Sequence, residues 1–311
     1  MKYLRFKDGD SFPAFGLGTW RTSTNEVYSS VFEALNTGYR HIDSAFLYQN
    51  EKQTGQAICD AIRLGIVTRE DLFITSKLWN SYHHPDNVEE GFRISLENLQ
   101  LEYIDLYLIH WPIAYKKGVL MPSGPEDLLS LETIPLESTW MAMQSLKKQG
   151  LVKHLGVSNF GISKLQRLID KTGIVPEMNQ VEIQPYFQQK ELLDYCNKND
   201  IRVTGFYPLG GPTTIKSDKN LLVNPVVMNI AAKHNATTAQ ILLAWGMARG
   251  YAVIPKSIRP ERIKENFDSQ KINLDDSDMC TMSELDCGFR MSVAAYSIFE
   301  GGYYNFENIF E

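Results

Sequence analysis

The stretch FGLGTWRTSTNEVYSSVFEALNTGYRHID, residues 15–43, contains a complete strand–helix–strand pattern. Apolar runs at 15–19 and 41–43 flank a segment in which Val27, Val31 and Leu35 recur every four residues, as on one face of a helix. Such units build parallel sheets. An open doubly wound sheet is disfavoured, because Gly16 and Gly18 are not followed by the third glycine of a GxGxxG fingerprint.

The same alternation continues along the chain. Further short apolar runs predict strands at 72–77, 105–110, 154–157, 178–182, 202–207 and 252–254, with amphipathic segments between them. Eight strands separated by helices in about 250 residues predict an α/β fold of the (β/α)8 TIM-barrel type. Ahead of the repeat, the turn signal Asp8-Gly9 between 3–6 and 11–13 predicts a β-hairpin. No low-complexity linker interrupts the pattern, so we expect residues 1–311 to form a single domain.

Composition narrows the classes of partner. Hydrophobic residues make up 43% of the chain and charged residues 22%, which is typical of a globular protein with a sizeable core. The net charge of -6 gives no reason to expect a nucleic-acid partner. No apolar run is long enough to span a bilayer, and the four cysteines form no CxxC pair. We expect a cytoplasmic monomer or homodimer that acts on a small molecule and binds neither membrane nor metal.

Ionisable residues follow three successive predicted strands. Asp43, Lys77 and His110 end strands two, three and four, and Tyr48 lies in the loop after strand two. Alone, each has an ordinary structural explanation as a helix cap, a packed ring or a solvated charge. Because the carboxyl ends of barrel strands meet at one mouth, their coincidence predicts a shared site.

The chemistry of this set suits carbonyl reduction, which needs a hydride donor at the carbon and a proton donor at the oxygen. A free tyrosine has a pKa of about 10. We expect the ammonium of Lys77 to lower the pKa of Tyr48, and Asp43 to hold Lys77 in place. A neutral His110 would donate a hydrogen bond that orients the carbonyl oxygen.

Five motifs carry a family resemblance: GYRHIDSAFLYQNE at 38–51, LYLIHWP at 106–112, GVSNF at 156–160, NQVE at 179–182 and IPKSIRPER at 254–262. Together they resemble the aldo-keto reductase family, aldose reductase-like members above all, over roughly residues 3–290. The chain is also similar to xylose reductases and plant aldose-6-phosphate reductases. The resemblance implies an NADPH-dependent aldehyde or aldose reductase in which Tyr48 donates the proton.

The resemblance also implies a cofactor site, with NADH a weaker ligand than NADPH. Lys256 and Arg262 bracket Ser257, and two cations with a hydroxyl suit the 2′-phosphate that distinguishes NADPH. Arg259 either reinforces that phosphate site or faces solvent. The expected cofactor contacts are Gly18, Thr19, Trp20, Arg21, Asp43, Ser158, Asn159, Gln180, Phe206, Tyr207, Leu209, Gly211, Lys256, Ser257, Ile258, Arg259, Arg262, Glu265 and Asn266.

The substrate pocket is expected beside the four ionisable residues, with an apolar wall. The expected contacts are Trp20, Leu47, Tyr48, Trp79, His110 and Trp111. By resemblance, Leu47 stands where xylose reductases carry an acidic residue, which argues against specialisation for pentoses. The aromatic-rich tail 288–311 either covers the pocket, as the resemblance implies, or only packs on the barrel.

Some relatives close an acidic clasp over the cofactor, whereas here Thr213 and Thr214 follow the PLGGP turn. Asp218 or Arg21 can substitute for that clasp; without it we expect faster cofactor release. Three alternative functions stay open. They are a non-catalytic NADPH-binding module of the channel-subunit or crystallin kind, a reductase specialised for a sugar phosphate, and a metal-dependent hydrolase. The last is disfavoured because no HxH pair ends a predicted strand.

Overall fold

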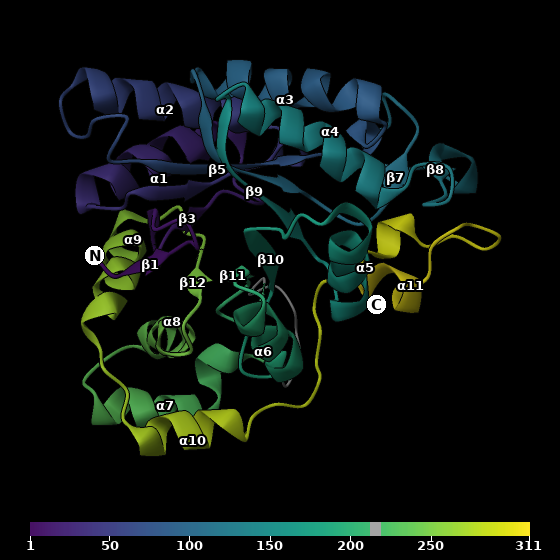
Figure 1. Ribbon diagram of the computed structural model, residues 1–311. Coiled ribbons are helices and arrows are strands. Elements are labelled where there is room, and N and C mark those ends of the chain that lie inside the picture. Colours follow the sequence, from purple (N-terminus) through teal and green to yellow (C-terminus); the bar gives the residue numbers. More distant parts are fainter. Residues whose placement is uncertain (212–218) are drawn as a thin grey trace.

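The computed structural model describes residues 1–211 and 219–311, and within them eight parallel strands form one curved sheet (Figure 1). In sheet order these are β12 (Ala252–Val253), β11 (Arg202–Phe206), β10 (Met178–Glu182), β9 (Val152–Ser158), β6 (Ile104–Ile109), β5 (Phe73–Leu78), β4 (His41–Asp43) and β3 (Leu17–Gly18). Phe15 forms a parallel bridge with Val253, which joins the two edges of the sheet. The expected (β/α)8 barrel is confirmed.

The barrel closes where the first strand meets the last. The backbone N–H of Gly16 donates to the carbonyl of Val253 at 2.9 Å, and that of Gly18 to Pro255 at 3.0 Å. A Cβ on Gly18 would stand 2.8 Å from the carbonyl oxygen of Ile254, so only glycine allows this close approach. The first strand is shorter than the predicted 15–19, because Phe15 makes only an isolated bridge.

Helices cover the outside of the barrel (Figure 1). The α-helices of the described residues are α1 (Thr24–Thr37), α2 (Glu51–Arg63), α3 (Pro85–Leu99), α4 (Leu136–Lys148), α5 (Ile162–Thr172), α6 (Lys190–Lys198), α7 (Pro225–Lys233), α8 (Thr238–Ala248), α9 (Pro260–Asp268), α10 (Asp276–Ser283) and, in the C-terminal tail, α11 (Phe306–Phe310). Helix α1 buries the face of Val27, Val31 and Leu35 that its spacing predicts. The capping box of Thr237 with Gln240 starts α8 as expected.

The N-terminal hairpin seals one end of the barrel. Strands β1 (Tyr3–Arg5) and β2 (Ser11–Pro13) pair antiparallel, as predicted. Phe12 in β2 and Phe6, just after β1, pack into a buried cluster with Phe73, Leu106 and Met178 of the amino-terminal halves of barrel strands. This apolar plug leaves the carboxyl ends of the strands as the open mouth.

A second antiparallel pair, which the sequence pattern did not predict, lies in the loop after β6. Strands β7 (Ala114–Tyr115) and β8 (Leu128–Leu129) stand at the mouth, next to the C-terminal tail (Figure 1). The tail ends in α11, which docks on α5: the ammonium of Lys164 donates to the carbonyl of Asn308 at 2.7 Å. The tail therefore packs on the barrel through α11.

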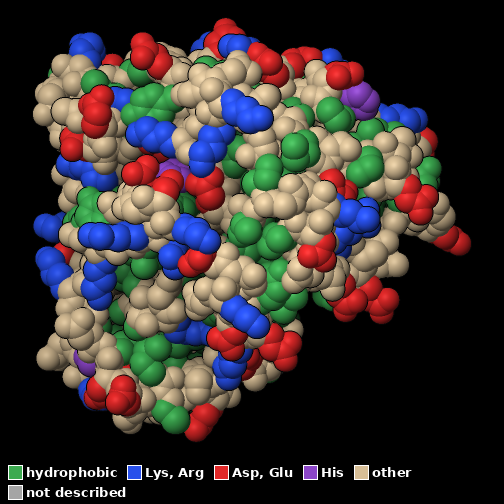
Figure 2. Space-filling model, viewed as in Figure 1, with side chains coloured by type: hydrophobic (Ala, Val, Ile, Leu, Met, Phe, Trp, Pro, Cys, Tyr) green, Lys and Arg blue, Asp and Glu red, His purple; other side chains and the backbone are tan. Residues whose placement is uncertain are grey.

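Acidic and basic side chains are interspersed over the face seen in Figure 2. A mixed distribution of charge on a face of this kind is ordinary for a globular protein. In the described part of the chain, no helix combines the length and apolar character that a membrane crossing requires.

Candidate active site

The four ionisable residues at the strand ends meet at the barrel mouth. Lys77 comes from β5, Asp43 ends β4, His110 follows β6, and Tyr48 ends a short 3-10 helix, Phe46–Tyr48. The Lys77 ammonium donates to Asp43 Oδ1 at 2.6 Å, to the carbonyl of Ser44 at 2.8 Å and to the Tyr48 hydroxyl at 3.3 Å. All three ammonium hydrogens have acceptors, so the lysine is held in one position.

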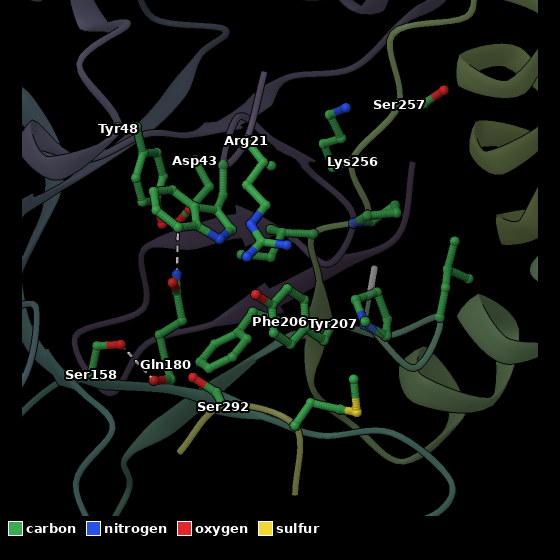
Figure 3. A pocket seen from close by; sticks show the side chains of 18 of the residues that line it. Arg21, Asp43, Tyr48, Ser158, Gln180, Phe206, Tyr207, Lys256, Ser257 and Ser292 are labelled. Carbon is green, nitrogen blue, oxygen red and sulfur yellow. Dashed lines mark hydrogen bonds between the residues drawn. The ribbon is translucent and has the colours of Figure 1, made fainter. Parts of the chain in front are cut away.

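Burial puts the Lys77–Asp43 pair in a medium where charge matters strongly. Lys77 is 0% exposed, and this burial lowers its pKa while Asp43 acts in the opposite direction. The second carboxylate oxygen of Asp43 accepts from the side-chain amide of Gln180 at 2.6 Å, a bond drawn in Figure 3. Gln180 therefore belongs to the network that holds the ion pair, besides its expected place in the cofactor site.

The direction of the pKa shift of Tyr48 differs from the expectation. Burial, reinforced by the negative charge of Asp43, raises the pKa of the Tyr48 phenol well above 10. The prediction that Lys77 lowers this pKa overall is wrong, because burial disfavours the phenolate more than the ammonium favours it. Tyr48 is thus a neutral phenol at neutral pH and can donate its proton. The Lys77 ammonium, 3.3 Å from the hydroxyl, would stabilise the phenolate that forms.

His110 is a neutral imidazole at neutral pH. Burial lowers its pKa well below 6.5, and the positive charge of Lys77 acts in the same direction. Its ring stands edge-on to Tyr48, with centroids 5.8 Å apart. A neutral imidazole offers one N–H donor and one acceptor, which suits the orienting role that its position predicts.

A cavity of about 1070 Å³ runs from these residues to the start of α9. Most of the expected contacts line it: Gly18, Trp20, Arg21, Asp43, Leu47, Tyr48, His110, Trp111, Ser158, Asn159, Gln180, Phe206, Tyr207, Leu209, Gly211, Lys256, Ser257, Ile258, Arg259, Arg262, Glu265 and Asn266. One cavity therefore joins the two sites that the sequence predicts.

Three expected residues do not line the cavity. Lys77 lies beneath Tyr48. Thr19 is buried, and its hydroxyl donates to the backbone carbonyl of Asp43 at 2.9 Å. Trp79 is fully buried; its indole N–H donates to the carbonyl of Leu120 at 2.8 Å, and its ring packs edge-on against His110. Trp79 therefore supports the imidazole from behind, and its expected contact with substrate stays a prediction.

Three basic side chains lie at the other end of the cavity. Lys256, Arg259 and Arg262 lie in the loop after β12 and on α9, are exposed, and form no ion pair with any described residue. Ser257 is buried, and its hydroxyl accepts from the backbone N–H of Arg259 at 3.2 Å. Three free cations around one cavity end fit an anionic ligand such as a phosphate. Arg259 is both exposed and part of the lining, so the two expected roles are compatible.

The middle of the cavity fits a planar amide. The hydroxyl of Ser158 donates to the carbonyl of Gln180 at 2.8 Å, and the amide nitrogen of Asn159 donates to the carbonyl of His110 at 3.0 Å. The amide oxygen of Asn159 is buried without a partner among the described residues, so it can accept from a ligand. Phe206, at the end of β11, supplies an aromatic face there (Figure 3).

The expected clasp can be located only in part. Arg21 lines the cavity in a left-handed backbone conformation, with φ of 57°. Thr213, Thr214 and Asp218 lie outside the described residues.

The sequence patterns missed several lining residues. The additional ones are Met121, Pro208, Leu222, Thr237, Thr238, Ala239, Ile254, Pro255 and the tail segment 291–296. The capping box at Thr237 marked a helix start, and a helix N-terminus that opens on a cavity is a signal for an anionic ligand. The aromatic richness of the tail was the other usable signal, although it did not identify which tail residues face the cavity.

One group of possible metal ligands lies at the opposite, amino end of the barrel. Ligand atoms of Asp8, His154 and Glu177 lie within 4.8 Å of one another. The same Glu177 carboxylate accepts from the ammonium of Lys147, and its other oxygen bonds to the imidazole of His154 at 2.5 Å. These contacts form an ion-pair network remote from the cavity.

Comparison with known proteins agrees with this architecture. The chain is similar to the NAD(P)H-dependent D-xylose reductase of Scheffersomyces stipitis, at 38% identity over 94% of this chain and 96% of that one. It superimposes on the aldose reductase of Schistosoma japonicum with a TM-score of 0.88 and 38% identity, covering 95% and 96% of the two chains. A Bombyx mori aldo-keto reductase in complex with NADP gives 0.87 and 35%, covering 96% and 97%.

The family model described as "Aldo/keto reductase family" matches residues 14–286, which span the barrel from before β3 to just beyond α10. The match stops short of the tail segment that lines the cavity. The matched barrel also carries, at its open mouth, the cluster of Asp43, Tyr48, Lys77 and His110. The site geometry and the sequence similarity therefore agree, and the chain belongs to the aldo/keto reductase family.

Proposed function

We propose that this chain is an NADPH-dependent reductase that converts uncharged aldehydes or aldoses to alcohols, with residues 1–311 acting as one domain. The observation that carries the proposal is the contact of the Lys77 ammonium with both the Asp43 carboxylate and the Tyr48 hydroxyl, at 2.6 and 3.3 Å. That contact lies at one end of a cavity whose other end presents free cations. The proton donor and the dinucleotide site thus open on the same space.

The cofactor assignment has two supports. The Bombyx mori relative was solved with NADP, and the Scheffersomyces stipitis relative is named as NAD(P)H-dependent. In this chain, Lys256, Arg262 and Ser257 supply the charges and hydroxyl that a 2′-phosphate requires, so NADH should bind more weakly. Asn159 and Ser158 would hold the carboxamide, against the face of Phe206. Bound there, the cofactor supplies the hydride.

The chain's own residues would supply the proton and the orientation. His110, as a neutral imidazole, donates a hydrogen bond to the carbonyl oxygen and places it near the Tyr48 hydroxyl. Tyr48 transfers its proton to that oxygen as the carbon is reduced. The resulting phenolate is stabilised by Lys77, whose position Asp43 and Gln180 maintain. Burial of this end excludes water and strengthens each of these interactions.

Lining residues at the substrate end favour an uncharged substrate. Around Tyr48 and His110 the lining includes Leu47, Trp111 and Tyr296, none of which carries a charge at neutral pH. A sugar phosphate would need a cation to offset the desolvation of its phosphate. The reductase specialised for sugar phosphates therefore ranks below the reductase of neutral aldehydes. A non-catalytic module ranks lower still, because the four ionisable residues are complete and in contact.

A substrate panel tests the proposal. Oxidation of NADPH and of NADH is followed with glyceraldehyde, xylose, benzaldehyde and glucose 6-phosphate, for the unmodified chain and for Tyr48→Phe. We expect turnover of the neutral aldehydes with NADPH, and a loss of about 1000-fold in kcat for Tyr48→Phe, since a general acid contributes about 100- to 10,000-fold. NADPH binding, measured by fluorescence, should change less than about twofold, because only a hydroxyl is removed. A chain that binds NADPH but reduces no aldehyde would instead be the binding module.

A further inference from the structure

The tail places a second phenol in the chamber of the proposed proton donor. Tyr296 lies in a short 3-10 helix, Ala295–Ser297, and lines the same cavity end as Tyr48, His110 and Trp111. Its ring meets that of Trp111 edge-on, with centroids 6.2 Å apart. The ring of Tyr48 in turn stands edge-on to His110, the chain neighbour of Trp111, and both phenols line the same cavity.

The hydroxyl of Tyr296 is available to a ligand. It forms no hydrogen bond with any described residue, whereas its tail neighbour Tyr304 uses its hydroxyl twice, donating to Leu129 at 2.6 Å and accepting from Ala114 at 2.8 Å. Burial raises the pKa of Tyr296 well above 10, so it is a neutral phenol that can both donate and accept. Because Tyr296 is half-buried in the cavity lining and its hydroxyl has no described protein partner, that hydroxyl can bind a ligand or water there.

Two sets of bonds hold the tail segment that carries Tyr296. On one side the buried carboxylate of Glu182 accepts from the backbone N–H groups of Met291 and Ser292, at 2.8 and 2.7 Å. On the other side the hydroxyls of Tyr115 and Ser297 share a hydrogen bond of 2.5 Å. Tyr296 lies between these anchors and adjoins the second. Its hydroxyl is therefore positioned before any substrate enters, which reduces the ordering cost of binding.

What this phenol can recognise follows from its surroundings. Tyr48 and His110 are assigned to the carbonyl oxygen, and the nearby lining from Trp111, Leu47 and Val293 is apolar. A substrate with a hydroxyl close to its carbonyl would satisfy the Tyr296 hydroxyl. An unsubstituted aldehyde of the same length would shield the Tyr296 hydroxyl from water and give it no hydrogen-bond partner. That aldehyde would therefore bind more weakly.

We propose that Tyr296 is a specificity-determining residue, whose hydroxyl binds a substrate hydroxyl near the carbonyl and so selects hydroxyaldehydes over unsubstituted aldehydes. This inference rests on the proposed reductase function and names its substrate class.

The test compares two three-carbon aldehydes, glyceraldehyde and propanal, which differ only in the two hydroxyls. The unmodified chain should have the higher kcat/KM for glyceraldehyde. In Tyr296→Phe the ratio of kcat/KM for glyceraldehyde to that for propanal should fall about tenfold, as expected for loss of one hydrogen bond in a buried site. Tyr303→Phe is the matched control, because Tyr303 belongs to the same tail but is 57% exposed; its ratio should equal that of the unmodified chain.

Ser292→Ala is measured alongside, since Ser292 is the other tail residue with a hydroxyl in the lining. An unchanged ratio in Tyr296→Phe, or a tenfold fall in Ser292→Ala alone, would overturn the assignment to Tyr296. A second measurement uses only the unmodified chain, with glycerol and 1-propanol as inhibitors. Glycerol should inhibit at a lower concentration than 1-propanol, and the reverse order would contradict the proposal. Failure of the reductase function itself is distinct, because the unmodified chain would then reduce neither aldehyde.

Discussion

The two ends of the cavity handle charge in opposite ways. At the chemical end, Lys77 is fully buried and its ammonium is saturated by acceptors of the protein. At the far end, Lys256, Arg259 and Arg262 are exposed and form no ion pair with any described residue. One end is organised before any ligand arrives, whereas the other leaves its cations for the ligand to neutralise.

This difference follows from what each end has to do. A proton donor needs fixed geometry and a dry surrounding, and the protein must supply the partners that a buried charge requires. A phosphate brings its own negative charge, so an internal ion pair would compete with it. An exposed cation without an ion-pair partner also destabilises the fold very little, because water solvates its charge.

The largest effect is expected from breaking the buried end. Lys77→Met removes the partner of Asp43 and the cation near Tyr48. We expect kcat/KM to fall about 1000-fold, and the free energy of unfolding to fall by about 3–5 kcal/mol, as is typical when one member of a buried ion pair is removed. Steady-state kinetics and thermal unfolding measure the two effects.

Lys256→Met is the control at the other end of the cavity. It should leave the unfolding midpoint nearly unchanged, because Lys256 is exposed and unpaired. Equal destabilisation by the two substitutions would contradict the contrast between the ends.

A smaller effect is expected at the cation end. Arg262→Ala should raise the KM for NADPH by about 10- to 100-fold, which corresponds to one charge-assisted hydrogen bond. The KM for NADH should change less than about threefold, because NADH lacks the 2′-phosphate. Lys264→Ala, an exposed residue of α9 outside the cavity lining, is the matched control. Equal increases for both cofactors would show that Arg262 binds something other than that phosphate.

The smallest effect concerns a buried carboxyl behind the chemical end. Glu51, the first residue of α2, is buried and accepts from the hydroxyl of Ser76 at 2.5 Å. Burial raises its pKa from 4.5 to about 7. Because the folded-state pKa is the higher one, the stability that this group contributes is complete below pH 4.5 and is lost as the pH rises through about 7.

Glu51→Gln cannot ionise, so the variant escapes that loss. Relative to the unmodified chain, it should gain stability between pH 5 and pH 8, by at most about 3 kcal/mol. Urea unfolding at the two pH values measures the gain. Glu97→Gln, at an exposed position of α3, is the control. A difference between Glu51→Gln and the unmodified chain that stays constant with pH would contradict the raised pKa.

Much of the barrel could be predicted from local patterns. All eight strands lie where short apolar runs predict them, with ends shifted by a few residues, and α1 buries the face that its four-residue spacing marks. The clustering of the four ionisable residues could also be predicted, because parallel strands of a barrel bring their carboxyl ends together at one mouth. These residues are Asp43, Tyr48, Lys77 and His110. Neither inference needs knowledge of which distant side chains surround a residue.

Other features depend on exactly such distant contacts. Trp20, Trp79 and Trp111 look alike in the sequence, yet Trp79 is buried behind His110 while the other two line the cavity. The raised pKa of Tyr48 likewise reflects burial contributed by many segments.

The sequence by itself determined the order of the elements and the residues at the mouth of the barrel, because periodicity and strand direction are local properties of the chain. Only the tertiary structure decided that the tail residues 291–296 complete the cavity and that Tyr296 faces Trp111. Those outcomes depend on packing between residues that are far apart along the chain, and no local pattern records that packing.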